Sequence, residues 1–318
     1  MMLYFYIFTF LLSFISLGVA SGLVANAFVG VTRVLGINEY IITFILVGAA
    51  TSLPEIFVSV ASFITNSPAV SVGNVIGANL ANITLVLGIV AFLAGGIDIG
   101  NKIPKKIFWV SFVLALLPSV LVFGGGINRL DGVVLCLIFL AYVYVFVSEA
   151  ELFEKPARHL PYGVHFFSDL FSNVKNLIIG LALLSFSALF IVFFGSSFAD
   201  YLSLNTLFFS TIFLGLVTTL PELLFGIRSA ILNHPALAMG NILGSVVFNS
   251  TVIPGVLSIL STAQTTISNS TFLINSFFTF IAFFFLSIFS YSGSKISRNE
   301  GLLLILLYVL FFISYFML

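Results

Sequence analysis

The sequence predicts an all-α membrane protein whose ten transmembrane helices form two inverted five-helix repeats. Of its 318 residues, 60% are hydrophobic and 7% charged, and the mean hydropathy is +1.25. Soluble domains carry about 25% charged residues, so this chain cannot build a water-solvated surface. Apolar runs long enough to cross a bilayer recur along the chain. A polar motif inside this apolar sequence appears twice, 167 positions apart.

Charge and cysteine content exclude several classes of protein. The 11 basic and 11 acidic residues give a formal net charge of zero, which argues against a nucleic-acid partner. The single cysteine, Cys136, rules out an intrachain disulfide. The N-terminus lacks the basic region of a signal peptide, so we expect residues 3–20 to belong to a retained first span.

Ten apolar stretches are candidate spans, at about 20 residues per crossing. They lie at 3–31, 40–65, 69–94, 107–124, 132–147, 176–200, 206–231, 235–260, 271–291 and 301–317. The most polar connection, 148–175, separates a first half at 1–147 from a second half at 176–318. Because five is an odd number, the second half must enter the bilayer from the opposite side, which inverts it.

The basic residues orient the chain, because cytoplasmic loops are enriched in Lys and Arg. When loops are placed alternately on two faces, every basic residue except Arg129 falls on one face. We therefore expect that face, with the 148–175 loop, to be cytoplasmic and both termini to be external to the cell membrane. If the chain had one span fewer, the later loops would change face and the basic residues would be divided between both faces. The observed bias to one face therefore supports ten spans.

The repeated motif occupies 48–82 in the first half and 215–249 in the second. The first copy contains T-S-L-P-E and G-N-V-I-G-A-N-L-A-N, and the second contains T-T-L-P-E and G-N-I-L-G-S-V-V-F-N. The residues that recur without a gap are Thr51, Pro54, Glu55, Gly73, Asn74, Gly77 and Asn82, as Thr218, Pro221, Glu222, Gly240, Asn241, Gly244 and Asn249.

Glu55 and Glu222 lie well inside spans two and seven, whereas the other nine acidic residues lie in loops or at span ends. A charge at mid-bilayer costs at least ~2.5–3.5 kcal/mol, so such residues usually face a cavity or a partner. No mid-span Lys or Arg can pair with either residue. A packed, protonated Glu is the purely structural alternative, but it does not explain why both copies retain the carboxylate.

Each of these glutamates directly follows a proline, which removes one helical hydrogen bond. Pro54 frees the carbonyl of Ala50, and Pro221 frees that of Val217. Loose carbonyl oxygens beside a carboxylate outline a cation site, although an ordinary proline kink is the simpler explanation. Helical spacing aligns further oxygens with the two glutamates, from Thr51, Ser59, Ser62 and Asn66 with Ser52 at the rim, and from Thr218, Ser229 and Asn233 with Thr219 at the rim.

Spans three and eight contribute amides and a hydroxyl on one helix face. These are Asn74 and Asn82 in span three, and Asn241, Ser245 and Asn249 in span eight. Close helix packing explains the neighbouring glycines but not the amides, which are costly to bury in lipid. All of these candidate ligands are oxygen atoms, which suits hard cations such as Ca²⁺, Na⁺ or Mg²⁺.

The charge of the site constrains its mechanism. Two carboxylates about 5 Å apart at an effective dielectric constant of about 20 repel by about 3 kcal/mol. One divalent cation, two monovalent cations or two protons would each neutralise the pair. Competition between Ca²⁺ and Na⁺ or H⁺ for one site is a physical basis for exchange, and inverted halves would supply two access states.

At these residues the sequence resembles the cation/Ca²⁺ exchanger superfamily, and within it the small prokaryotic sodium/calcium exchangers. The two repeats of that family carry G-T-S-L-P-E and G-N-x-x-G-S-N-x-x-N/D. The resemblance implies ten helices, with spans one and six sliding against the others. The ligands that it implies are Glu55 and Glu222 for both ions, the backbone carbonyls of Thr51 and Thr218, oxygens from Ser52, Thr219 and Ser245, and Asn82 and Asn249 at the centre.

The chain departs from the family motif at five positions. Ala50 and Val217 replace a glycine, Ala78 replaces the serine of the first repeat, and Val246 replaces the asparagine of the second. Asn249 stands where some members have an acidic residue, so the site holds at most two negative charges. Na⁺ and H⁺ therefore both remain candidate counter-ions.

The sequence thus predicts a secondary antiporter that exchanges Ca²⁺ for Na⁺, with H⁺/Ca²⁺ exchange at the same glutamates as the alternative. It predicts no enzyme activity, no cofactor besides the transported ions, and no obligate partner besides the lipid bilayer. A cation channel would share the oxygen ligands, but two inverted halves form no ring-like filter. An intramembrane protease would need paired mid-span Asp, or a Ser with a mid-span base, and the sequence has neither.

Overall fold

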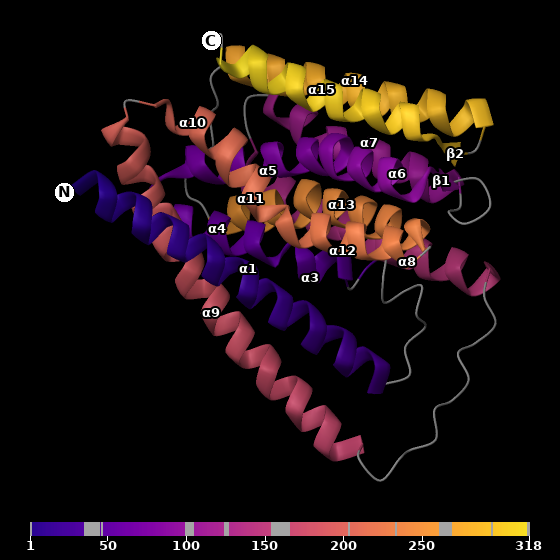
Figure 1. Ribbon diagram of the computed structural model, residues 1–318, viewed down its shortest axis with the longest axis horizontal. Coiled ribbons are helices and arrows are strands. Elements are labelled where there is room, and N and C mark those ends of the chain that lie inside the picture. The colour runs from indigo at the N-terminus through magenta and orange to yellow at the C-terminus, as the bar shows by residue number, and fades with distance from the viewer. Residues whose placement is uncertain are drawn as a thin grey trace.

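The computed structural model is a bundle of helices, with one two-stranded ribbon at its edge (Figure 1). It describes residues 2–34, 45, 47–98, 105–123, 127–153, 166–202, 204–232, 234–260, 269–293 and 295–316. Strands β1 (Ile97–Asp98) and β2 (Lys295–Ile296) pair antiparallel, with Ile97 opposite Ile296.

Each half of the chain contains long helices and helices that are broken inside a predicted span. The first half comprises α1 (Met2–Val34), α3 (Gly48–Thr51), α4 (Leu53–Ile64), α5 (Pro68–Ala81), the π-helix η2 (Asn82–Val86), α6 (Leu87–Ala94), α7 (Lys105–Phe123) and α8 (Arg129–Phe153). The second half comprises α9 (Phe166–Tyr201), α10 (Thr206–Phe209), the π-helix η3 (Ser210–Leu214), α11 (Gly215–Thr218), α12 (Leu220–Ile231), α13 (Pro235–Leu260), α14 (Asn269–Gly293) and α15 (Arg298–Phe316).

Seven segments of the described chain are long and apolar enough to cross a membrane. They are Tyr4–Val24, Pro68–Ala94, Arg129–Ser148, Phe167–Tyr201, Thr206–Ile231, Leu237–Leu260 and Arg298–Tyr315. Shorter apolar helices at Leu53–Ile64, Lys106–Leu117 and Leu273–Phe289 fall within predicted spans two, four and nine. The chain is therefore a multi-pass helical membrane protein, and the count of ten inverted spans remains a prediction.

The helices extend beyond the apolar stretches that predicted them. The connecting loop was predicted at 148–175, but α8 continues to Phe153 and α9 begins at Phe166. Hydropathy detects only the part of a helix that suits lipid, whereas the backbone hydrogen bonds of a helix can continue into water. The segment 154–165 lies outside the described residues.

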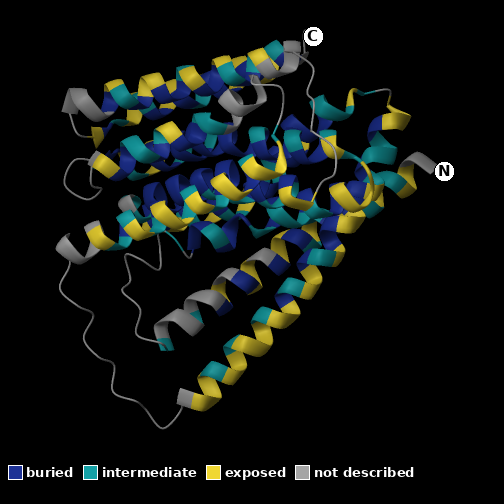
Figure 2. Cartoon of the chain, turned by 180° about the vertical axis from the view of Figure 1, so that it is seen from behind, coloured by how far each residue is buried: buried dark blue, intermediate teal, exposed yellow. Residues whose placement is uncertain are grey.

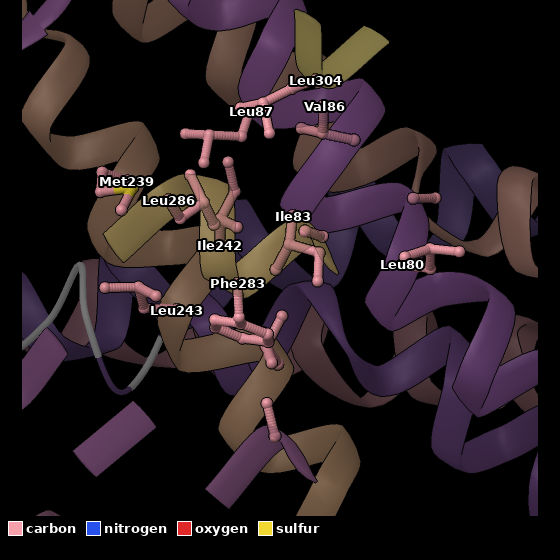
Figure 3. Close-up of a cluster of buried hydrophobic side chains, with 14 of the residues drawn as sticks. Leu80, Ile83, Val86, Leu87, Met239, Ile242, Leu243, Phe283, Leu286 and Leu304 are labelled. Carbon is pink, nitrogen blue, oxygen red and sulfur yellow. The ribbon is translucent and has the colours of Figure 1, made fainter. Parts of the chain in front are cut away.

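Burial separates an inner layer of helices from an outer one (Figure 2). In α5, 10 of 14 residues are buried, whereas outer helices expose large apolar side chains such as Phe186 on α9, at 62%, and Leu303 on α15, at 50%. An outward apolar surface of this extent fits a lipid environment. The inner cluster in Figure 3 is formed by Leu80, Ile83, Val86 and Leu87, by Met239, Ile242 and Leu243 on α13, and by Phe283, Leu286 and Leu304.

The long helices α1 and α9 lie side by side at one edge of the molecule (Figure 1). They share a second apolar cluster that includes Leu17, Ala20 and Val24 of α1 and Leu184 and Ala188 of α9. Part of α4 also packs against α9. This pair corresponds to predicted spans one and six, and the same cluster extends to α4 and α5 through Val58, Ala61 and Val70.

The two halves cross each other at glycines of the repeated motif. A Cβ atom added to Gly215 would lie 2.7 Å from the carbonyl carbon of Gly77, and one added to Gly48 would lie 3.0 Å from that of Gly244. Gly48 and Gly77 are the counterparts of Gly215 and Gly244, so the two crossings are equivalent. Backbones can approach this closely only without side chains. The crossings bring the two motif copies together inside the bundle.

Candidate cation-binding site

Each glutamate lies just after a break in its helix. Helix α3 ends at Thr51, Ser52 adopts φ −82° and ψ 3°, and α4 restarts at Leu53 with a proline in its first turn. Thr219 has nearly the same conformation, φ −82° and ψ 1°, between α11 and α12. The predicted proline kink is therefore a one-residue irregularity in both halves, and in the first half the backbone hydrogen bonds from Ser52 to Gly48 and from Ile56 to Ser52 still span it.

The break places each carboxylate at the N-terminal end of a helix. Glu55 lies in the first turn of α4 and Glu222 in the first turn of α12, and both side chains are fully buried. Unpaired backbone N–H groups give a helix N-terminus partial positive charge, which favours a nearby anion. The same local sequence thus buries each acidic side chain and supplies a field that partly supports its charge.

The two carboxylates are fully buried where the two halves of the chain cross. None of their four oxygens has a hydrogen-bond partner among the described residues. Every described Lys and Arg whose burial the structure records is exposed, so none of these can compensate the pair. Breaking a buried ion pair costs several kcal/mol because it leaves an uncompensated charge, so this pair calls for a positive counter-charge.

A threonine in each half donates a hydrogen bond to an asparagine in the other half. Thr51 Oγ1 donates a hydrogen bond to Asn241 Oδ1 at 3.1 Å, and Thr218 Oγ1 donates one to Asn74 Oδ1, also at 3.1 Å. These two bonds are equivalent by the 167-residue offset. Each amide oxygen keeps a second lone pair that could contact a cation. Thr218 also lies beside the Glu55 carboxylate, and Thr51 beside that of Glu222.

Asn82 and Asn249 are fully buried, and within the described ranges neither amide has a hydrogen-bond partner for its oxygen or its nitrogen. Asn82 begins the π-helix η2, whereas Asn249 lies inside the continuous helix α13. A buried polar group without a partner costs about 1–3 kcal/mol. Single-turn π-helices often occur at functional sites, and these amides suit a site whose ligand is a cation.

The three predicted hydroxyl ligands differ in their surroundings. Ser52 Oγ is buried, with no hydrogen-bond partner in the described part of the chain. Thr219 Oγ1 instead donates to the Leu216 carbonyl at 2.8 Å, which returns it to its own helix. Ser245 Oγ donates to the Gly48 carbonyl at 3.1 Å and lies 3.1 Å from Thr51 Oγ1. The surroundings of Ser52 and Ser245 therefore fit the predicted role of an ion ligand better than those of Thr219 do.

The polar stripe predicted along span two is shorter than expected. Ser59 and Ser62 are buried, and Ser62 donates to the Ser59 carbonyl at 2.9 Å. Asn66 is exposed, with φ 55°, because α4 ends at Ile64 before reaching it. In the second half Ser229 is buried, while Asn233 lies outside the described residues.

Sequence reasoning missed one buried contact between the halves. Asn79 Nδ2 donates a hydrogen bond to Ser250 Oγ at 2.8 Å, and Asn79 Oδ1 has no partner among the residues that the structure places. The signal was present, because Asn79 is an amide in an apolar helix and immediately follows Ala78 in the motif. Its counterpart is Val246, which cannot make this bond.

The described residues contain no group of three or more His, Cys, Asp or Glu that could hold a metal. The site therefore combines one carboxylate pair with neutral oxygens from amides, hydroxyls and the broken helices. This set of donors fits a hard cation and does not fit a transition metal, which favours nitrogen and sulfur.

Known proteins share both the sequence and the fold. The sodium/calcium exchanger protein family matches residues 5–148 and 174–317. The sodium/calcium exchanger MaX1 of Methanosarcina acetivorans is 25% identical over 322 residues, covering 90% of this chain and 91% of that protein. A structure of the sodium–calcium exchanger NCX_Mj superimposes with a TM-score of 0.69 at 24% identity, covering 97% of both chains.

A structure of an H⁺/Ca²⁺ exchanger, CAX, superimposes with a TM-score of 0.80 at 18% identity, covering 96% of this chain and 81% of that one. At these identities the two structures establish a common fold and nothing more. The family match is of a different kind, because it extends over nearly the whole chain and includes both copies of the motif. The chain therefore belongs to the sodium/calcium exchanger protein family.

Proposed function

We propose that this protein is a secondary antiporter that exchanges Ca²⁺ for Na⁺ by alternating access. The observation that carries the proposal is the pair of carboxylates, Glu55 and Glu222, which are fully buried and have no hydrogen-bond partner among the described residues. A buried pair of like charges is unstable unless cations or protons neutralise it. Because the chain belongs to an exchanger family, we propose that the carboxylates bind cations in order to transport them, and not to catalyse a reaction.

The proposed ion ligands are oxygens from both halves. Glu55 and Glu222 supply the charge, and Asn82, Asn249 and Ser52 supply neutral oxygens that have no partner within the described chain. The remaining proposed ligands, which already make hydrogen bonds, are Thr51, Thr218, Thr219, Asn74, Asn241 and Ser245. Ca²⁺ takes six to eight oxygens with flexible geometry, and a set drawn from four broken or crossing helices can supply them.

The proposed architecture is ten spans in two inverted halves, joined by a cytoplasmic segment, with both termini external. The equivalent glycine crossings and the equivalent Thr–Asn bonds support an approximate twofold relation between the halves. In such transporters the substrate site lies between the repeats, where half-helix termini meet. The α1–α9 pair, which packs at one edge of the molecule, is the element that would move against this site to change access.

Exchange of Ca²⁺ for H⁺ is the second candidate. Two protons neutralise two carboxylates as completely as two Na⁺ ions do, and a structure of an H⁺/Ca²⁺ exchanger shares the fold of this chain. The site has no third carboxylate among the described residues that would require a further cation. Both candidates use the same ligands and differ only in the driving gradient.

Flux in proteoliposomes tests the proposal. We expect Ca²⁺ uptake when the Na⁺ gradient is directed outward, and loss of uptake in either Glu55→Gln or Glu222→Gln. Asp200→Asn is the matched control, because it removes a carboxylate at an exposed position at the end of α9. Uptake driven by a pH gradient and indifferent to Na⁺ would select the H⁺ alternative. Undiminished uptake in either Gln variant would refute the site.

A further inference from the structure

We infer that Asn79 and Ser250 are positioning residues of the proposed ion site. Asn79 Nδ2 donates a hydrogen bond to Ser250 Oγ at 2.8 Å between α5 and α13, and both side chains are buried. This bond fixes how the segments that carry Asn82 and Asn249 lie against each other, and neither of its residues touches the ion. The inference rests on the proposed function and deepens it, because it names residues outside the proposed ligands on which ion affinity depends.

The bond lies next to both central asparagines. Ser250 directly follows Asn249 in α13, and Asn79 precedes Asn82 by three residues, which places the two on one face of their helix. Within the described ranges, the side-chain amides of Asn82 and Asn249 have no hydrogen-bond partner of their own. The placement of these amides therefore depends on how their two backbones pack, and the Asn79–Ser250 bond joins those backbones.

The helix beyond each central asparagine is irregular. The π-helix η2 runs from Asn82 to Val86. In α13, Pro254 has no N–H group, which removes the helical hydrogen bond to the Ser250 carbonyl. Both π-helices and prolines are places where a helix bends or changes its register. A directional bond just before these irregularities holds the two segments in one arrangement.

The equivalent contact in the other half shows that packing alone does not require a polar pair. By the 167-residue offset, the counterparts of Asn79 and Ser250 are Val246 and Ile83, which are apolar and fully buried. Asn79 instead keeps a buried amide oxygen that has no partner in the described part of the chain, which costs stability. Buried polar groups can be retained because they specify one arrangement of the elements that they join.

Calorimetric titration of Ca²⁺ into the purified full-length protein in detergent, without Na⁺ and at fixed pH, tests this inference. Ser250→Ala removes the hydroxyl that accepts the bond. We expect the Ca²⁺ dissociation constant to rise about fivefold, which corresponds to one hydrogen bond. The reason is that part of the binding free energy must then order the loosened segments. The number of Ca²⁺ ions bound per chain should not change.

Tyr315→Phe is the matched control. Asn275 Nδ2 donates to Tyr315 Oη at 2.9 Å between α14 and α15, and Asn275 Oδ1, like Asn79 Oδ1, has no partner among the residues that the structure describes. The control therefore removes an acceptor hydroxyl from a buried asparagine, as Ser250→Ala does, but outside the repeated motif. We expect both variants to melt at lower temperature in chelator, and only Ser250→Ala to bind Ca²⁺ more weakly.

The double variant Asn79→Leu/Ser250→Ala separates positioning from folding. Replacing both partners of a buried hydrogen bond by apolar groups can leave stability nearly unchanged, whereas removing one partner cannot. We expect the double variant to melt close to the wild type in chelator and still to bind Ca²⁺ about fivefold more weakly. It also takes the place of Ser250→Ala if that variant does not purify as a folded protein.

The outcomes separate this inference from the function on which it rests. Absence of Ca²⁺ binding by the wild type would refute the proposed function itself. Wild-type affinity in Ser250→Ala or in the double variant would retain that function and overturn the role of the bond, as would equal weakening in Tyr315→Phe. Weaker binding in Asn79→Leu alone, with Ser250→Ala unaffected, would make Asn79 an ion ligand and overturn its positioning role.

Discussion

The two copies of the motif share one frame, which consists of a helix irregularity, a buried glutamate and a Thr–Asn hydrogen bond, but the side chains around this frame differ. Both interrupt their helix at the same point, bury a glutamate in the next turn, and bond a threonine to an asparagine of the other half. They differ at neighbouring positions. Ser245 provides a hydroxyl where Ala78 has none, and Asn79 makes a hydrogen bond where Val246 cannot.

The helices that carry the central asparagines also differ. Asn82 starts the π-helix η2, while Asn249 lies in an uninterrupted α-helix. Features that place the carboxylates are thus duplicated, whereas the polar groups around them are divided between the halves. We infer that the frame must be symmetric so that the two glutamates can meet, and that the surrounding oxygens can be supplied by either half.

The largest difference that we expect between the halves concerns their glycine crossings. In Gly215→Ala the new Cβ would lie 2.7 Å from the carbonyl carbon of Gly77, whereas in the counterpart Gly48→Ala it would lie 3.0 Å from that of Gly244. Overpacking costs about 1–3 kcal/mol and sometimes more, so we expect Gly215→Ala to lose more stability than Gly48→Ala. Thermal unfolding of the purified protein in detergent measures both losses of stability. Equal losses in the two variants would contradict the expected difference between the crossings.

The central asparagines should affect ion binding alike despite their different helices. Asn82→Leu and Asn249→Leu each remove a buried amide that has no partner in the described chain, so the ion-free protein should gain about 1 kcal/mol of stability. Both variants should also lose most of the thermal stabilisation that Ca²⁺ gives, since a ligand stabilises only the state that binds it. Melting with Ca²⁺ and with chelator measures both effects. Retained Ca²⁺ stabilisation in one variant would mean that one half dominates the site.

The smallest expected effect comes from the hydroxyl that the first half lacks. Ser245→Ala removes the contacts to Thr51 and Gly48. Loss of a hydrogen bond worth about 1 kcal/mol should raise the counter-ion concentration for half-maximal Ca²⁺ efflux about fivefold. Ala78→Ser introduces the equivalent hydroxyl in the first half and should lower that counter-ion concentration by a smaller factor. The counter-ion concentration for half-maximal Ca²⁺ efflux measures both. A similar change of the same sign in both variants would contradict the proposed equivalence.

The sequence was sufficient to predict the parts of this structure that local chemistry determines. A carboxylate in an apolar span has few options, so burial of Glu55 and Glu222 could be expected, and Pro54 predicted a disturbed helix. The bond from Thr51 to Asn241 could not be predicted, because the periodicity of one helix does not say which helix it meets. Thr219 illustrates the same limit, since only the fold shows that its hydroxyl returns to its own backbone. For Asn66 a signal was overlooked, because the Ser-Pro pair that follows favours a helix end.

The central claim is that one glutamate from each half binds a single shared ion. Calorimetric titration of Ca²⁺ into the purified protein, in the absence of Na⁺ and at fixed pH, tests it most directly. We expect one Ca²⁺ per chain in the wild type, none in Glu55→Gln or Glu222→Gln, and no further loss in the double variant. Two Ca²⁺ per chain, or one retained in each single variant, would show that the glutamates act separately and would contradict the account.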